Sequence, residues 1–192
     1  MEENGMMTYP IDIAGMKRDL PICRVTDDLY IGAFVIFGDV ELTRAAAQGL
    51  LDKIDFEYDY LITAESKGIP LVYEMARISG QNKYFLARKA PKLYMRNILK
   101  CEVQSITTTK RQTLYLDGYD AKEMCGKRII IVDDVISTGE SLRAMEQLVL
   151  QAGGIIVGKM AILAEGDAYD RDDIISLEYL PLFNKEGEPL PR

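Results

Sequence analysis

Two adjacent carboxylates, Asp133 and Asp134, follow an apolar run at residues 129–132 and precede a segment rich in hydroxyl groups. An apolar strand that ends in two carboxylates must present them to water or to a ligand, because an unpaired charge in an apolar core is costly. The amides at the start of a following helix would bind an anion, and the carboxylates would accept hydrogen bonds from sugar hydroxyls. This segment therefore predicts a ribose 5-phosphate site, although such residues also cap turns and helices. Its members are Asp133, Asp134, Val135, Ile136, Ser137, Thr138, Gly139, Glu140 and Ser141.

The rest of the composition restricts the chemistry. Histidine is absent from the 192 residues, which excludes Ser-His-Asp and Cys-His triads and a histidine general base. The three cysteines, Cys23, Cys101 and Cys125, are widely spaced and are predicted to be free thiols. Catalysis must therefore depend on carboxylates, lysine, arginine, hydroxyls or backbone amides.

Charge and hydropathy favour one compact domain. The chain has 23 basic and 30 acidic side chains, a formal net charge of −7, so a general nucleic-acid-binding surface is not expected. No apolar run approaches the roughly 18 residues that a membrane helix needs, and the first residues are acidic where a signal peptide is basic. We therefore expect a cytoplasmic protein without a membrane partner.

Apolar segments of strand length alternate with amphipathic helices. This alternation predicts an α/β fold with a mainly parallel sheet and helices on both faces, in which ligands bind at the carboxyl ends of the strands. The strands are expected at 29–37, 61–62, 83–87, 128–132 and 155–163, and the helices at 39–54, 69–78 and 140–151, while the segment 174–183 follows this core. The turns that follow two of the strands, 63–68 and 133–141, are therefore the expected binding loops.

Residues 129–141 closely resemble the phosphoribosyl pyrophosphate motif of type I phosphoribosyltransferases. Their sequence is Ile-Ile-Ile-Val-Asp-Asp-Val-Ile-Ser-Thr-Gly-Glu-Ser. Residues 59–68, Asp-Tyr-Leu-Ile-Thr-Ala-Glu-Ser-Lys-Gly, resemble the pyrophosphate loop of that family, and Ala-Arg-Lys at 87–89 resembles the basic end of its next strand. The resemblance implies a single domain over residues 1–192. It implies a core at about 39–165 and a small hood built from about 1–38 and 166–192.

The resemblance also assigns site roles. Asp133, Asp134 and Lys89 would be catalytic, and Mg²⁺ would be held mainly by the substrate, phosphoribosyl pyrophosphate, with no firm protein ligand. A non-proline cis peptide is expected within residues 64–67. The expected pyrophosphate-binding residues are Glu65, Ser66, Lys67, Gly68, Arg88, Lys89 and Lys92.

The segment 88–111 carries seven basic residues against one acidic residue, Glu102, in an otherwise acidic chain. A local positive charge suits a small anionic substrate better than a polymer, although a solvated basic hairpin has the same composition. In the resembled family this place holds a mobile loop that closes over the substrate, and its tip would be at 105–109.

The choice of nucleobase depends on small departures from the family patterns. Ser137 stands where hypoxanthine and guanine enzymes usually carry an acid, which argues against those bases. The orotate loop pattern is incomplete, since it needs a histidine. The Ala-Glu-Ser-Lys-Gly loop at 64–68 is most similar to adenine phosphoribosyltransferases, yet Thr107 replaces their loop glutamate, as in xanthine enzymes. Adenine is therefore the expected substrate. Xanthine, orotate and a non-catalytic regulator that senses phosphoribosyl pyrophosphate are the alternatives.

Candidate base contacts come from the chain ends and from the end of a strand. Phe34 could stack on a purine, and so could Phe37, although core packing is the alternative for both. Glu165 follows the last core strand, where ligands are expected, or is an acidic turn residue. The family resemblance further implies a homodimer.

Overall fold

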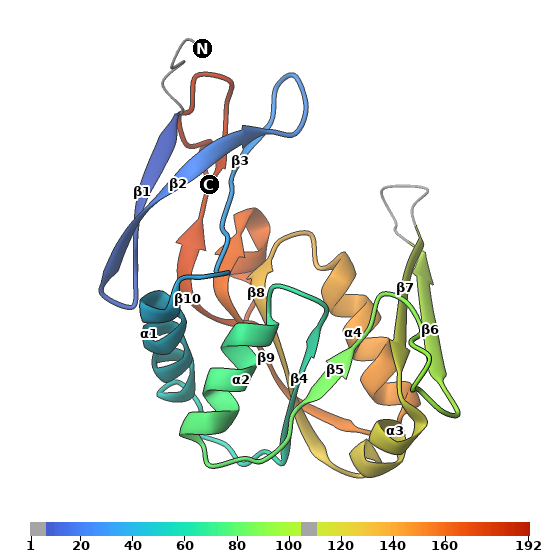
Figure 1. The fold of residues 1–192 in the computed structure, drawn as a ribbon. Helices are drawn as coiled ribbons and strands as arrows, with labels where there is room; N and C mark the ends of the chain where they lie inside the picture. The colour runs from blue at the N-terminus through green and yellow to red at the C-terminus, as the bar shows by residue number, and fades with distance from the viewer. Residues whose placement is uncertain (1–6, 105–110) are drawn as a thin grey trace.

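The computed structural model describes residues 7–104 and 111–192 and is organised around a five-stranded sheet in the order β10-β9-β8-β4-β5 (Figure 1). Every neighbouring pair in this sheet is parallel. The strands are β4 (Tyr60–Ala64), β5 (Phe85–Ala87), β8 (Arg128–Ile136), β9 (Ile155–Glu165) and β10 (Ile175–Leu180). Their carboxyl ends share one edge of the sheet, where ligands bind in folds of this type.

Helices cover both faces of the parallel sheet, as expected. They are α1 (Val40–Leu51), α2 (Ile69–Ile78), α3 (Gly118–Met124) and α4 (Glu140–Gln151). Ile130 and Val132 of β8 are buried with α1 and α2, whereas Ile129 and Ile131 are buried with α4. Because side chains alternate along a strand, one apolar run supplies both halves of the core. The expected α/β fold is confirmed.

A second, antiparallel sheet brings the two ends of the chain together and forms the hood. Its order is β1-β2-β3-β11, with β1 (Thr8–Ile13), β2 (Met16–Arg24), β3 (Tyr30–Gly32) and β11 (Leu182–Phe183). Figure 1 shows this sheet beyond the carboxyl ends of the parallel strands. The predicted hood boundary at 166 needs correction, because β10 pairs with β9 in the parallel sheet and only β11 reaches the hood.

A two-stranded hairpin, β6 (Leu99–Gln104) and β7 (Arg111–Leu116), stands apart from both sheets. Cys101, Leu114 and Leu116 bury it against α4. The backbones of Arg88 and Tyr115 exchange two hydrogen bonds of 2.8 Å, which fix β7 to the residue that follows β5. The expected loop tip at 105–109 lies outside the described residues. Within residues 7–104 and 111–192, no helix combines the length and apolar character needed to cross a bilayer.

Candidate active site

The carboxyl ends of β4, β5 and β8 open into a shared cavity of about 480 Å³. Both predicted binding loops contribute to its walls, together with the basic end of β5 and one aromatic residue from the segment that joins the hood to α1. The lining residues are Phe37, Ala64, Glu65, Ser66, Lys67, Lys89, Asp133, Asp134, Val135 and Ser141. The fold therefore brings together segments that lie about 100 positions apart in the sequence.

The two carboxylates lie within β8, which continues to Ile136 instead of ending at the predicted 132. Asp134 is almost fully buried, and its Oδ2 lies 2.7 Å from Lys67 Nζ on the neighbouring loop. Asp133 is half-buried, and its Oδ1 accepts a 2.9 Å hydrogen bond from the Asp134 backbone amide. Burial raises the pKa of Asp133 above its ordinary value, and the negative charge of Asp134 raises it further. A cationic or hydroxylated ligand would relieve this electrostatic cost.

Asp133→Asn is expected to increase the free energy of unfolding by about 1 to 3 kcal/mol at pH 8, since it removes a carboxylate that the fold disfavours. The unfolded chain releases this proton at the ordinary aspartate pKa, whereas the folded protein keeps it to higher pH, so the wild type loses stability as the pH rises through that window. Urea unfolding of both proteins at pH 4, 6 and 8 measures this difference. A gain that is greatest at pH 4 would contradict the assignment.

Buried polar atoms without a hydrogen-bond partner concentrate in this cavity region. Among the described residues four side-chain atoms are in this state, and three of them, Thr63 Oγ1, Arg88 Nε and Asp134 Oδ2, belong to the ends of β4, β5 and β8. Asp134 Oδ2 is close to Lys67 Nζ, but at an angle outside hydrogen-bond geometry. Unsatisfied buried groups are costly, and of these three residues Asp134 lines the cavity, where a polar ligand could reach its carboxylate.

The loop after β4 has the geometry that the resemblance implied. The peptide bond between Glu65 and Ser66 is cis, inside the predicted interval 64–67. At Gly68 a Cβ atom would lie 2.1 Å from Thr63 Oγ1, so only glycine fits there. The close approach of this glycine to β4 fixes the path of the loop and directs Lys67 toward Asp134.

Glu65 connects this loop to the basic end of β5. Its carboxylate accepts a 3.1 Å hydrogen bond from the Lys89 backbone amide and lies 3.5 Å from an Arg88 guanidinium nitrogen and 3.9 Å from Lys92 Nζ. The structure therefore places Glu65, Lys67, Arg88, Lys89 and Lys92 around the same cavity region. Two cationic side chains and one backbone amide therefore converge on one carboxylate, an arrangement that suits the binding of an incoming polyanion.

A smaller cavity of about 100 Å³ adjoins the first one at Asp133 and Val135. It is enclosed by the predicted 5-phosphate loop, residues 133 and 135–142. Gly139 has φ +78° and is the N-cap residue of α4. Because glycine has no side chain, the first amides of the helix face this loop without a capping group. The loop geometry is that of an anion cradle beside the acidic pair.

The proposed base contacts need correction. Phe34 is 4% exposed and packs in the core with α1, so it is not available to a base. Phe37, three residues later, is half-exposed and lines the large cavity. Burial alternates along this segment, with Phe34 and Ile36 buried and Val35 and Phe37 exposed, and the sequence pattern did not distinguish the two rings. Glu165 is buried at the carboxyl end of β9 and lines neither of these two cavities.

Comparison with known proteins agrees with this geometry. Residues 40–186 match the family model described as the phosphoribosyl transferase domain, which covers most of the chain. The chain belongs to the phosphoribosyltransferase family. The match includes both predicted binding loops and extends from α1 to β11.

The individual relatives of this chain are named after different substrates. The hypoxanthine/guanine phosphoribosyltransferase of Methanococcus maripaludis is 33% identical over 127 residues, which are 66% of this chain and 64% of that protein. The chain thus aligns with less than two thirds of that relative's length. Adenine phosphoribosyltransferase from Rhodothermus marinus has a TM-score of 0.64 at 23% identity and covers 93% of this chain and 96% of its own. The adenine enzyme of Trypanosoma brucei, solved with AMP, pyrophosphate and ribose-5-phosphate, has a TM-score of 0.60 at 21% identity, over 72% of this chain and 64% of its own.

Proposed function

We propose that this protein is a purine phosphoribosyltransferase that transfers ribose 5-phosphate from phosphoribosyl pyrophosphate to a purine. The observation that carries the proposal is the position of Asp133 and Asp134 between two anion-binding regions, the basic cluster at Glu65 and the cradle at Gly139. A sugar with a phosphate at one end and a pyrophosphate at the other has the complementary charge distribution. The names of the relatives support the same chemistry.

In the proposed reaction a ring nitrogen of the purine forms a bond to the anomeric carbon. The bond from that carbon to the pyrophosphate oxygen breaks, and pyrophosphate leaves with the electron pair. Asp133 and Asp134 would accept hydrogen bonds from the ribose hydroxyls and stabilise positive charge on the sugar, while Lys67, Arg88 and Lys89 would stabilise the departing pyrophosphate. Positioning and electrostatics therefore perform the catalysis.

Magnesium fits this proposal as an ion that enters with the substrate. Mg²⁺ commonly keeps most of its ligands from water and substrate phosphates, so the proposed reaction needs no site built from protein ligands alone. Asp133 and Asp134 are the carboxylates that would lie beside the ion. Bound Mg²⁺ would neutralise charge on the pyrophosphate.

We propose adenine as the base, because the 64–68 loop is most similar to adenine enzymes. A second candidate is hypoxanthine or guanine, which is favoured by the name of the Methanococcus maripaludis relative and weakens the argument drawn from Ser137. Chromatography of the nucleotide formed from phosphoribosyl pyrophosphate, Mg²⁺ and each purine tests the choice. AMP alone would support adenine, and IMP or GMP would support the second candidate. The homodimer and the cytoplasmic location stay predictions.

Phe37→Ala is expected to increase the KM for the purine about tenfold, because the ring lines the cavity and would stack on the base. Its melting temperature should stay close to that of the wild type, since half of the ring is exposed. Phe34→Ala is the matched control, and it should cost about 3 to 5 kcal/mol of unfolding free energy by leaving a cavity in the core. Steady-state kinetics with variable purine measures the first effect. An unchanged KM in the Phe37 variant would remove this ring from the base site.

A further inference from the structure

Arg171 lies against the loop that forms the small cavity, although 32 positions separate it from Gly139. It follows the short helix η1 (Gly166–Asp170) at the carboxyl end of β9. A Cβ atom on residue 139 would lie 2.9 Å from Nη1 of the Arg171 guanidinium. The left-handed backbone at Gly139 favours glycine at this position, and the Arg171 guanidinium occupies the space beside it.

The guanidinium is held in a fixed orientation by Asp173. Arg171 Nε and Nη2 donate to the two oxygens of Asp173 at 2.9 and 2.8 Å, in a bidentate pair. The same carboxylate accepts from Lys159 at 2.6 Å, and Lys159 pairs with Glu146 of α4 at 2.5 Å. This network connects β9 and α4 with the segment that follows η1. The remaining guanidinium nitrogen of Arg171, Nη1, lies on the side of Gly139.

The cradle itself lacks positive side chains. Residues 133–141 include three acidic residues, Asp133, Asp134 and Glu140, and no lysine or arginine. A phosphate dianion bound there would meet helix amides but also a negative local field. Lys67 pairs with Asp134 at the strand end of this segment, and Arg171 lies against the backbone of Gly139 at its helix end.

We infer that Arg171 is a positioning residue for the 5-phosphate site. Its guanidinium packs against Gly139, and its positive charge offsets the negative charge of residues 133–141. It is not among the residues that line the small cavity, so it acts through the loop backbone and through its charge, without contacting the phosphate. This inference rests on the proposed function, which assigns the 5-phosphate to that loop. The inference concerns only the 5-phosphate end of the substrate, because Arg171 does not belong to the basic cluster around Glu65 that would bind the pyrophosphate.

Binding of the two halves of the substrate tests this role. Titration calorimetry with ribose 5-phosphate and, separately, with pyrophosphate and Mg²⁺ would compare the wild type with Arg171→Gln and Arg171→Lys. We expect Arg171→Gln to weaken ribose 5-phosphate about tenfold, with a reduced salt dependence, and to leave pyrophosphate unchanged. Arg171→Lys should recover part of the loss, because it keeps the charge but not the bidentate fork.

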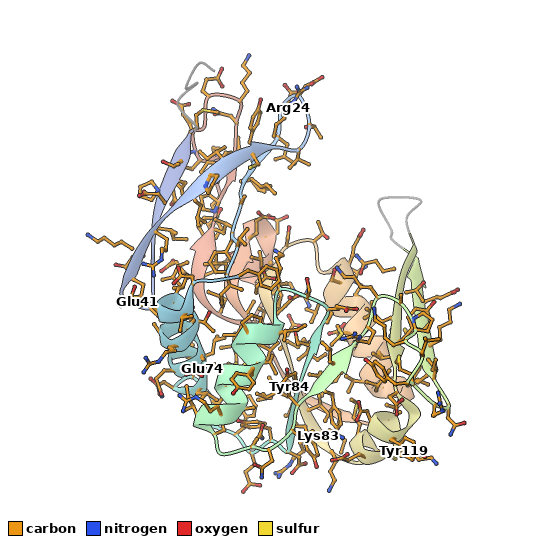
Figure 2. The ribbon with its side chains drawn as sticks, viewed as in Figure 1. Arg24, Glu41, Glu74, Lys83, Tyr84 and Tyr119 are labelled. Carbon is orange, nitrogen blue, oxygen red and sulfur yellow. The ribbon has the colours of Figure 1, made fainter. Side chains whose placement is uncertain are left out.

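Arg77→Gln is the matched control, since Arg77 makes an equivalent bidentate pair with Glu74 at 2.8 and 2.8 Å on α2. Figure 2 shows Glu74 on α2 toward the side of the molecule that carries α1. This variant should bind both ligands like the wild type. Unchanged ribose 5-phosphate binding in Arg171→Gln, or equal losses for both ligands, would overturn the inference.

Thr138→Ala separates this inference from the proposed function. If Thr138→Ala weakens ribose 5-phosphate binding and Arg171→Gln does not, the loop assignment stands and only the role of Arg171 fails. If neither variant changes that binding, the assignment of the loop to the 5-phosphate fails with it. Weakening in both variants, with intact pyrophosphate binding, is the result that we expect.

Discussion

Replacing Asp133 and Asp134 together by asparagine is expected to reduce kcat/KM for phosphoribosyl pyrophosphate by about 10³-fold or more. The two carboxylates lie at the junction of the two cavities, where positive charge would develop on the sugar. Asparagine keeps their size but removes both negative charges and replaces one acceptor oxygen of each by an amide donor. Pyrophosphate release under saturating purine measures the loss, and circular dichroism checks that the variant is folded.

A matched control exists in the hood, where Asp27 and Asp28 form an adjacent and exposed acidic pair. Asp27→Asn with Asp28→Asn changes the net charge equally and should leave kcat/KM within about twofold of the wild type, as surface substitutions usually do. Turnover retained by the Asp133 and Asp134 variant would remove the acidic pair from the reaction.

Lys67→Met is expected to reduce kcat about 10²-fold, because Lys67 would stabilise the departing pyrophosphate. It should also lower the unfolding free energy by about 1 to 2 kcal/mol, a discounted value because Lys67 is 44% exposed although Asp134 is only 5% exposed. The stability loss arises from the charge of Asp134, which is left without its cation. Initial rates and urea unfolding at pH 8 measure the two effects.

A double-mutant cycle isolates this pair. Adding Asp134→Asn to Lys67→Met should recover the stability but not the activity, since the buried charge is gone and the pyrophosphate cation is still missing. Lys185→Met is the control, because Lys185 is exposed and its partner Glu186 is 3.7 Å away. Equal stability of the wild type and Lys67→Met would contradict the coupling between the two loops.

The local parts of the fold could be predicted because they depend on short-range patterns. The bounds of α2 and α4 coincide with the predicted 69–78 and 140–151, where apolar residues recur at helical spacing and glycines follow. The length of β8 was underestimated, since a strand that carries two carboxylates does not look like a buried strand. Its parallel neighbour β9 continues past the acidic pair and keeps the backbone hydrogen-bonded.

The parts that depend on distant pairing could not be predicted. The hood joins Tyr30 to Phe183, and no local pattern indicates which strand a two-residue segment will pair with. The sequence places 174–183 only after the core, whereas Pro181 separates β10 in the core sheet from β11 in the hood. The expected boundary at 166 was wrong for this reason.

The candidate site was predictable where its residues are adjacent in sequence. The motifs at 64–68 and 133–141 predicted two anion-binding loops, and the structure brings residues of both to one cavity. The cation beside Gly139 was missed, because only folding places Arg171 there. The ring that lines the cavity was also not separated from Phe34, since both belong to the same apolar run.

The most direct test of phosphoribosyl transfer is pyrophosphate release by the wild-type protein with phosphoribosyl pyrophosphate and Mg²⁺ against adenine, hypoxanthine, guanine, xanthine, orotate and uracil in parallel. We predict release that depends on a purine, is fastest with adenine, and is lost in the Asp133 and Asp134 variant. Binding of phosphoribosyl pyrophosphate without release with any base would contradict catalysis and favour a sensing regulator.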